Sequence, residues 1–237
     1  MSTTQLILFS AIVVVGGFIQ GSTGMGFALI VAPVISLFNP ELLPVCVLIL
    51  MLPLSMYVAH REHRAVDRPG SAWITAGRLL GTFGGLAVLA WLSPRSLAIF
   101  VGLSTIAAVA ATWFMPAFTP GRGALATAGL ITGVTETATG IGGPPLALVY
   151  QHQPVAVMRS TLAVCFLVGQ VMSLIFLFAA GQVRQPQLLA AAQLLPALGV
   201  GALLSHYVHH RINERFMRSF VQLFAVASGV VLLVKAL

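Results

Sequence analysis

Charged residues are scarce in this sequence. The 237 residues include 12 lysines and arginines and 5 aspartates and glutamates, so 7% of the chain is charged, whereas 58% is apolar. Soluble globular proteins contain about 25% charged and about 45–50% apolar residues. A surface with so few charges does not suit a water-soluble domain. The composition therefore predicts an integral membrane protein.

Features of several other protein classes are also missing. The two cysteines, Cys46 and Cys165, lie in apolar runs without the spacing of metal ligands. No phosphate-binding loop is present, and the stretch HREHR at residues 60–64 lacks the His-Glu-x-x-His pattern of zinc enzymes. The net charge of +7 comes from arginines spread over short loops, so we expect no nucleic-acid partner. We also expect no metal, no cofactor and no enzymatic activity.

Apolar segments fill the whole chain. At about 20 residues for each membrane-spanning helix, a chain of this length allows roughly six to eight spans. The N-terminal residues show no signal-peptide cleavage pattern, so we expect the first segment to be retained. The apolar segments are 6–20, 27–38, 42–59, 73–92, 96–114, 124–137, 146–150, 161–180, 188–207 and 216–234. We predict an all-α polytopic membrane protein in which residues 1–237 form a single domain.

One glycine-rich stretch occurs twice and interrupts an apolar segment each time. Residues 17–27 read GFIQGSTGMGF, and residues 129–145 read GLITGVTETATGIGGPP. Both begin with Gly, an apolar residue, Ile, a polar residue and Gly, and both contain Thr-Gly-x-Gly with an apolar x. These Thr-Gly elements are 116 residues apart, and Arg78 and Gln193 lie in similar contexts 115 residues apart. The shared order of breaks and polar positions predicts a duplicated chain.

The arginine positions favour one threading of the two broken segments. If each broken segment crossed the membrane once, lysine and arginine would divide six against five between the two sides. If each instead enters and returns to its own side, with the N-terminus outside, the division is eight against three, as the positive-inside rule requires. The cytoplasmic group is then Arg61, Arg64, Arg68, Arg122, Arg159, Arg211, Arg215 and Arg218, and the external group is Arg95, Arg184 and Lys235.

This threading predicts inverted repeats. Each half would be a re-entrant or broken helical hairpin plus three transmembrane helices, with repeat 1 at about residues 1–118 and repeat 2 at about residues 123–237. The odd number of full crossings in each half makes the halves run in opposite directions. A hairpin that reaches fully across the membrane has the same parity, so the depth of the hairpins stays open.

The two breaks are candidate anion sites. A helix that restarts after a glycine-rich break presents unpaired N–H groups and the positive end of its dipole. Open backbone at membrane depth also needs cover from protein or a water-filled cavity, so we expect the breaks to face each other. The candidate substrate-binding residues are Gln20, Gly21, Ser22, Thr23, Gly24, Gly26, Thr135, Thr139, Gly140, Gly142 and Gly143. The alternative is that the small residues serve close helix packing alone.

Arg78 and Glu136 are charges placed inside apolar segments. Burial of either side chain costs about 2.5–3.5 kcal/mol on insertion scales, so each needs a partner or a ligand. Arg78 either binds the oxygens of the anion, pairs with Glu136 or extends toward the cytoplasm. Glu136 is a candidate for proton coupling, with a structural partnership to Arg78 as the alternative. Gln193, which matches Arg78 in the second half, is a further candidate substrate-binding residue.

The motifs GFIQGSTGMGFALIVAP and GLITGVTETATGIGGPPLALVY, one in each half, resemble those of the TauE/SafE sulfite-exporter family of membrane permeases. The resemblance covers the whole chain. It implies transport of small anions, including sulfite and organosulfonates such as sulfoacetate, across a bacterial cytoplasmic membrane. With that membrane, the threading chosen from the arginine positions predicts that both termini are periplasmic. It assigns ligand contacts to Gly21, Thr23, Gly24 and Gly26, and to Gly133, Thr139, Gly140, Gly142, Gly143, Pro144 and Pro145.

We therefore expect a secondary-active transporter that moves a small anion by alternating access around a site near the middle of the membrane. A channel-like or accessory membrane subunit, and a permease for an anion without sulfur, are the alternatives. Arg78 and Glu136 favour the transporter, because an accessory subunit has little reason to keep such charges at membrane depth. The expected partners are the small anion and the lipid bilayer, and a homo-oligomer remains an open alternative.

Overall fold

The structure is a computed structural model that describes residues 1–114, 120–208 and 214–236, and this part of the chain contains helices and loops but no strand. The α-helices are α1 (Thr3–Thr23), α2 (Phe27–Phe38), α3 (Val45–Arg61), α4 (Arg68–Trp91), α5 (Pro94–Phe114), α6 (Arg122–Thr139), α7 (Gly143–Tyr150), α8 (Val155–Ala179), α9 (Gln185–Val208) and α10 (Glu214–Ala236). Two short 3-10 helices, η1 (Pro40–Leu42) and η2 (His63–Ala65), precede and follow α3. Each predicted apolar segment corresponds to one α-helix, which confirms the all-α prediction.

Five helices in the described part are long and apolar enough to cross a membrane: α1, α4, α8 and most of α9 and α10. The 21 residues of α1 extend over about 31 Å at roughly 1.5 Å per residue, which matches a hydrocarbon core of about 30 Å. Large apolar side chains cover the outside of the bundle, with Leu80, Phe178 and Leu223 exposed by 66%, 76% and 68%. Such a surface suits lipid rather than water. The chain is a multi-pass membrane protein.

The helices α1 and α6 both end at the glycine of a Thr-Gly element. Gly24 follows α1 with φ of 81°, and Gly140 follows α6 with φ of 82°. Each glycine N–H donates to the carbonyl four residues earlier, which belongs to Gln20 in the first case and Glu136 in the second. Glycine adopts this left-handed conformation without steric cost, so it is the residue that ends a helix in this way. The sequence breaks are therefore helix caps.

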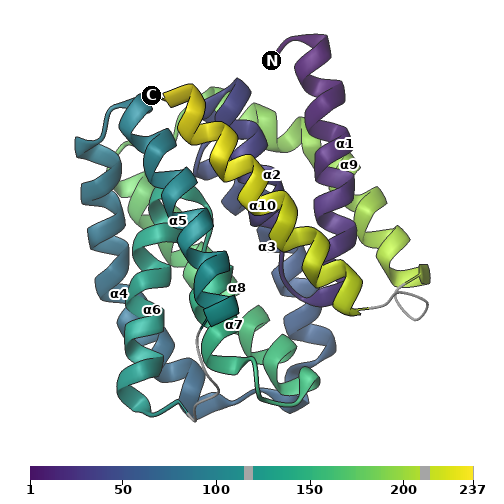
Figure 1. Cartoon of the computed structure of the whole chain (residues 1–237), viewed down its shortest axis with the longest axis vertical. Helices are drawn as coiled ribbons and strands as arrows, with labels where there is room; N and C mark the ends of the chain where they lie inside the picture. The colour runs from purple at the N-terminus through teal and green to yellow at the C-terminus, as the bar shows by residue number, and fades with distance from the viewer. Residues whose placement is uncertain (115–119, 209–213, 237) are drawn as a thin grey trace.

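The two helices that follow the caps run back toward the side from which their hairpins entered. α2 begins after Gly26, whose φ is 114°, and ends at Phe38. The carbonyl of Phe38 accepts a hydrogen bond of 3.4 Å from Gln5 in the first turns of α1, so the first hairpin opens toward the N-terminal end. The second hairpin consists of α6 and the short α7, which lie beside each other at the opposite end in Figure 1.

The two ends of the helix bundle carry different numbers of arginines. Both chain termini lie at one end (Figure 1), where Arg95 donates to the backbone carbonyl of Ala236. At the other end Arg159 pairs with Glu62 over 3.3 Å. Helices begin or end at this second end with Arg61, Arg68 and Arg122. Arg211, which the threading assigns to the same group, lies outside the described residues. Arg61, Arg68, Arg122 and Arg159 thus lie at one end of the bundle and Arg95 at the other, and the sides of the membrane to which these ends belong stay a prediction.

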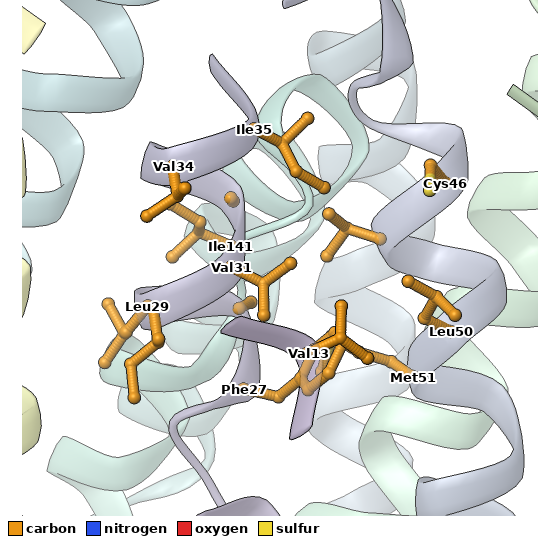
Figure 2. Close-up of a cluster of buried hydrophobic side chains, with 14 of the residues drawn as sticks. Val13, Phe27, Leu29, Val31, Val34, Ile35, Cys46, Leu50, Met51 and Ile141 are labelled. Carbon is orange, nitrogen blue, oxygen red and sulfur yellow. The ribbon is translucent and has the colours of Figure 1, made fainter. Parts of the chain in front are cut away.

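α2 is enclosed by other helices. Every residue from Phe27 to Ser36 is buried, although the helix has only 12 residues. Figure 2 shows Val31 and Ile35 on the side of this helix that faces α3, which carries Leu50 and Met51. Ile141 of the second break belongs to the same cluster. The second break therefore packs against the core that holds the helix of the first break.

Glycines let two helix pairs approach closely. A side chain at Gly129 of α6 would collide with the carbonyl of Ile74 in α4, and one at Gly201 of α9 would collide with the carbonyl of Val14 in α1. Extensive contacts also join α5 to α10 and α3 to α8. Close packing of small residues is a common way to associate helices in a membrane. It accounts for Gly129, which lies outside the two helix caps.

Candidate functional site

The first break is held by an amide side chain. Gln20 is buried in the last turn of α1, and its Nε2 donates to the carbonyl of Gly24 at 3.2 Å. Its Oε1 accepts from the N–H of Phe27 at 3.1 Å. Gln20 thereby satisfies one backbone acceptor and one backbone donor that the break leaves open. The hydroxyl of Thr23 lies 2.6 Å from the carbonyl of Met25, inside the same turn.

The second break is held by two threonine hydroxyls. Thr139 donates to the carbonyl of Thr135 at 2.7 Å and accepts from the N–H of Ile141 at 3.1 Å. Thr132 donates to the carbonyl of Gly142 at 3.3 Å. Hydroxyl groups that bond nearby backbone in this way replace the hydrogen bonds that a continuous helix would make. The second break is thus fixed to the end of α6.

Both breaks line the same cavity, which has a volume of about 210 Å³. Residues of the two breaks in its wall are Gln20, Thr23, Met25, Gly26, Gly143 and Pro144. The remainder of the wall comes from α2, α3, α5, α7, α8 and α10 and from the loop between α7 and α8. The cavity is therefore enclosed by helices from both halves of the chain. The expectation that the two breaks face each other agrees with this position.

Within the described residues, the cavity wall is uncharged. Its polar side chains are Gln20, Thr23, Gln151, Gln153 and Gln222, and most of the remaining wall is apolar. An anion in this cavity would be held by hydrogen-bond donors and helix dipoles rather than by a lining cation. In the described part of the chain, no group of three or more His, Cys, Asp or Glu side chains could hold a metal ion.

The two helices that start at the cavity offer different numbers of donors. The first N–H groups of any helix lack partners within the helix. At the start of α2 the N–H of Phe27 donates to Gln20. The next two residues, Ala28 and Leu29, each carry a backbone N–H group in the first turn of the helix, and both line the cavity. α7 starts with Gly143 followed by two prolines, which have no N–H group. The start of α2 is therefore the better site for an anion.

Arg78 and Glu136 form a buried ion pair. Nη2 of Arg78 donates to Oε2 of Glu136, and Nη1 donates to the carbonyl of Cys165 at 3.0 Å. The two side chains are 1% and 0% exposed. Gly169 of α8 makes room for the guanidinium, because any side chain there would collide with it. The pair joins α4, α6 and α8. An ion pair between Arg78 and Glu136 is the structural alternative that the sequence indicated for both residues.

The ion pair lies behind the second break. A Cβ atom at Gly142 would be 2.5 Å from Oε2 of Glu136, and the next residue, Gly143, lines the cavity. Neither Arg78 nor Glu136 is part of the cavity wall. The expectation that Arg78 contacts the anion therefore does not match its position in this structure. Glu136 contacts the backbone of the break instead.

The structure brings together part of the predicted site. Gln20, Thr23, Gly26 and Gly143 line the cavity. The glycines that shape the backbone next to these lining residues are Gly24, Gly140 and Gly142. Thr139 holds the second break without facing the cavity.

Four predicted residues lie elsewhere. Gly21 packs against α9, where a Cβ atom would be 2.5 Å from the hydroxyl of Ser205, and Ser22 donates to the carbonyl of Phe18 in its own helix. Thr135 donates to backbone carbonyls within α6. Gln193 is on the exposed face of α9, so it does not approach the site. Gln193 matches Arg78 in its position along the repeat, but this match did not predict the direction of its side chain.

Several lining residues were not identified from the sequence. Gln151 and Gln153 follow the short helix α7, and Gln222 lies in α10. Nε2 of Gln151 is buried and has no hydrogen-bond partner in the described part of the chain. Gln222 is polar within an apolar span, which is the same signal that pointed to Gln20. Apolar lining residues such as Phe166 give no signal in a chain that is apolar throughout.

Comparison with protein families gives a match that spans most of the chain. The family model described as Sulfite exporter TauE/SafE matches residues 8–232. No curated protein and no solved structure matches the chain. The matched range includes both breaks and every helix that contributes to the cavity wall.

Proposed function

The chain belongs to the TauE/SafE sulfite exporter family, and we propose that it is a secondary-active transporter of a small anion, sulfite or an organosulfonate. The observation that carries this proposal is the cavity of about 210 Å³ between the two glycine-rich breaks. It combines hydrogen-bond donors at the start of a buried helix with an uncharged wall that is mostly apolar and includes several glutamines. Such a site suits an anion that must lose its hydration water, bind and then dissociate on the other side of the membrane.

Alternating access requires two halves that can move against each other, and we propose that the halves are inverted repeats. The helix contacts support this arrangement. If α1 corresponds to α6 and α4 to α9, the packing of α4 on α6 is equivalent to the packing of α1 on α9. In the same correspondence α5 matches α10 and α3 matches α8. Each of these two pairs therefore joins a helix to its own counterpart in the other half. Repeats of opposite orientation around a site near the membrane midplane are common among secondary transporters.

The arginine-rich end of the bundle is proposed to face the cytoplasm of a bacterial cell. The short loops and helix ends there carry Arg61, Arg68, Arg122 and Arg159. Lysine and arginine in short loops are enriched on the cytoplasmic side of membrane proteins. Both termini would then lie in the periplasm.

Glu136 is the proposed coupling residue. Its carboxylate is fully buried, pairs with Arg78 and touches the backbone of Gly142 in the second break. Proton uptake by this carboxylate would weaken the ion pair and change the contact with the break. Protonation of Glu136 could therefore change the conformation of the second break directly, without the involvement of distant residues.

The test is uptake of radiolabelled sulfite and sulfoacetate into liposomes that contain the purified protein, with and without an imposed pH gradient. Thr23→Val removes a hydroxyl of the cavity wall and should reduce the uptake of both anions. Thr135→Val is the matched control, because that hydroxyl bonds only to backbone of its own helix in the described structure. Uptake of neither anion by folded wild-type protein would overturn the sulfur-anion assignment.

The coupling proposal is tested in the same liposomes. Glu136→Gln should remove the dependence of uptake on the pH gradient, and size-exclusion chromatography of the variant checks that it is folded. Gradient dependence that survives in folded Glu136→Gln protein would exclude Glu136 as the coupling residue, whatever its effect on the absolute rate.

A further inference from the structure

Arg159 is a charged side chain next to residues that line the cavity, although it is not itself part of the cavity wall. It lies in α8 directly after Met158, which lines the cavity. Its side chain crosses the first break, since a Cβ atom at Gly24 would be 2.9 Å from Cγ of Arg159. Gly24 stands between Thr23 and Met25, and both of these residues line the cavity. The side chain of Arg159 therefore lies against a part of the first break whose neighbouring residues line the cavity.

The contacts that hold Arg159 are long. Nη1 is 3.4 Å from the carbonyl of Ser22, and Nη2 is 3.4 Å from the carbonyl of Gly21. The ion pair between Nη2 and Oε1 of Glu62 measures 3.3 Å. Strong hydrogen bonds between charged groups are shorter, at about 2.7–2.9 Å. Nε of Arg159 is buried and has no partner in the described part of the chain. The guanidinium thus has donor capacity that its present partners do not use.

Glu62 does not depend on Arg159 alone. Its Oε1 is also paired with Nη2 of Arg61, at the shorter distance of 2.6 Å. If Arg159 turned away from Glu62, the carboxylate would keep a cationic partner. An exchange of partners by Arg159 would therefore leave no unpaired charge behind, which is the main cost of breaking an ion pair that is shielded from water.

Arg159 and Arg78 differ in their access to an anion. Arg78 is 1% exposed and is separated from the cavity by the second break. The side chain of Arg159 is 11% exposed and borders the first break, which contains the better set of backbone donors. A planar guanidinium fits the paired oxygens of a sulfite, sulfonate or carboxylate group.

We propose that Arg159 is the cation that recognises the transported anion, and that it exchanges its ion pair with Glu62 for the oxygens of the anion beside the first break. The inference rests on the proposed anion transport. Glu62 is then a competitor that occupies the arginine while the site is empty.

The proposal predicts opposite effects for the two members of the ion pair. Arg159→Gln should raise the KM for sulfite uptake by about tenfold or more, because a charged hydrogen-bond donor to the anion is lost. Glu62→Gln should lower the KM, because the competing carboxylate is removed. Arg64→Gln is the control: it removes a positive charge from the same loop, and Arg64 is exposed and forms no ion pair with Glu62 in the described part of the chain, so the KM should stay within about twofold of wild type.

A chemical rescue separates charge from packing. Arg159→Cys is treated with a methanethiosulfonate reagent that adds an ethylammonium group, or with one that adds an ethylsulfonate group. The native Cys46 and Cys165 are 0% and 1% exposed, so the introduced thiol is the expected target, and treated wild-type protein is the control. The positive group should restore a low KM, and the negative group should not.

The outcomes distinguish this inference from the proposed function. If wild-type protein moves neither sulfite nor sulfoacetate, anion transport fails and the role of Arg159 fails with it. If wild-type protein transports an anion but Arg159→Gln keeps the wild-type KM, the role of Arg159 alone is wrong. Equal rescue by both reagents would also overturn it, because a residue that merely fills space does not require a positive charge. If Arg159→Gln does not fold, the KM of Glu62→Gln, in which Arg159 is intact, decides the question.

Discussion

Gly24 and Gly140 end the two broken helices in the same conformation. Their φ angles are 81° and 82°, and each N–H donates to the carbonyl four residues earlier. The two residues are in different halves of the chain, yet each is followed by residues that line the shared cavity. The two breaks are also equally long, three residues each (24–26 and 140–142), so the same local structure occurs in both halves of the chain.

Replacement of either cap glycine by alanine should destabilise the protein and reduce transport. A left-handed conformation costs a residue with a side chain about 1–2 kcal/mol. The added carbon would also lie 2.9 Å from Cγ of Arg159 at Gly24 and 3.1 Å from Val47 at Gly140. Thermal unfolding in detergent measures the effect.

Gly199→Ala is the control for these substitutions. Gly199 lies in α9 with no other group within 4 Å of an added Cβ atom, so alanine there should leave the unfolding temperature unchanged or raise it. Equal unfolding temperatures for Gly24→Ala, Gly140→Ala and Gly199→Ala would contradict the role of the caps.

The Arg78–Glu136 pair should show strong coupling in a double-mutant cycle. Removal of one partner leaves a buried, unpaired group at a cost of about 3–5 kcal/mol. We therefore expect Arg78→Met and Glu136→Gln each to lower the unfolding temperature, and the double variant to be more stable than Arg78→Met alone. Additive losses in the double variant would show that the two side chains do not depend on each other.

A larger side chain in the cavity should block transport. Ala147 of α7 lines the cavity and is 5% exposed. Ala147→Val and Ala147→Phe should reduce uptake progressively, because each takes up more of the space for the anion. Leu148→Phe changes the neighbouring residue, which is outside the cavity wall, and should reduce uptake less. Folding is checked by size-exclusion chromatography, and undiminished uptake by folded Ala147→Phe protein would place the transport route elsewhere.

The sequence predicted the helices and the two breaks well, because both depend on local chemistry. Apolar runs bounded by Pro, Gly and charged residues gave every α-helix, and the Thr-Gly elements marked the points where α1 and α6 end. The division of the arginines between the two sides of the membrane stays a prediction.

The direction of individual side chains was harder to predict. Gln193 matches Arg78 along the proposed repeat, but it is exposed on α9, a helix that is apolar around much of its circumference. Hydrophobic periodicity does not identify the inner face of such a helix. The choice between ligand and Glu136 for Arg78 depended on contacts between three helices, which are distant in the sequence. Arg159, which we propose as an anion contact, was not singled out for a related reason: in the sequence it is one arginine among several near helix ends.

The central claim is that both breaks contact the same bound anion, and cysteine protection tests it most directly. Thr23→Cys and Gly143→Cys place a thiol in each break, and the Cβ atom added at Gly143 would have 3.8 Å to its neighbour Phe166. Ser22→Cys, next to Thr23 but directed at α9, is the control. The rate of modification by a small thiol reagent is measured at increasing sulfite or sulfoacetate concentration. The account predicts that the same anion slows modification of both breaks with one half-maximal concentration and leaves Ser22→Cys unaffected. Protection of one break alone, or of neither in a protein that transports the anion, would contradict it.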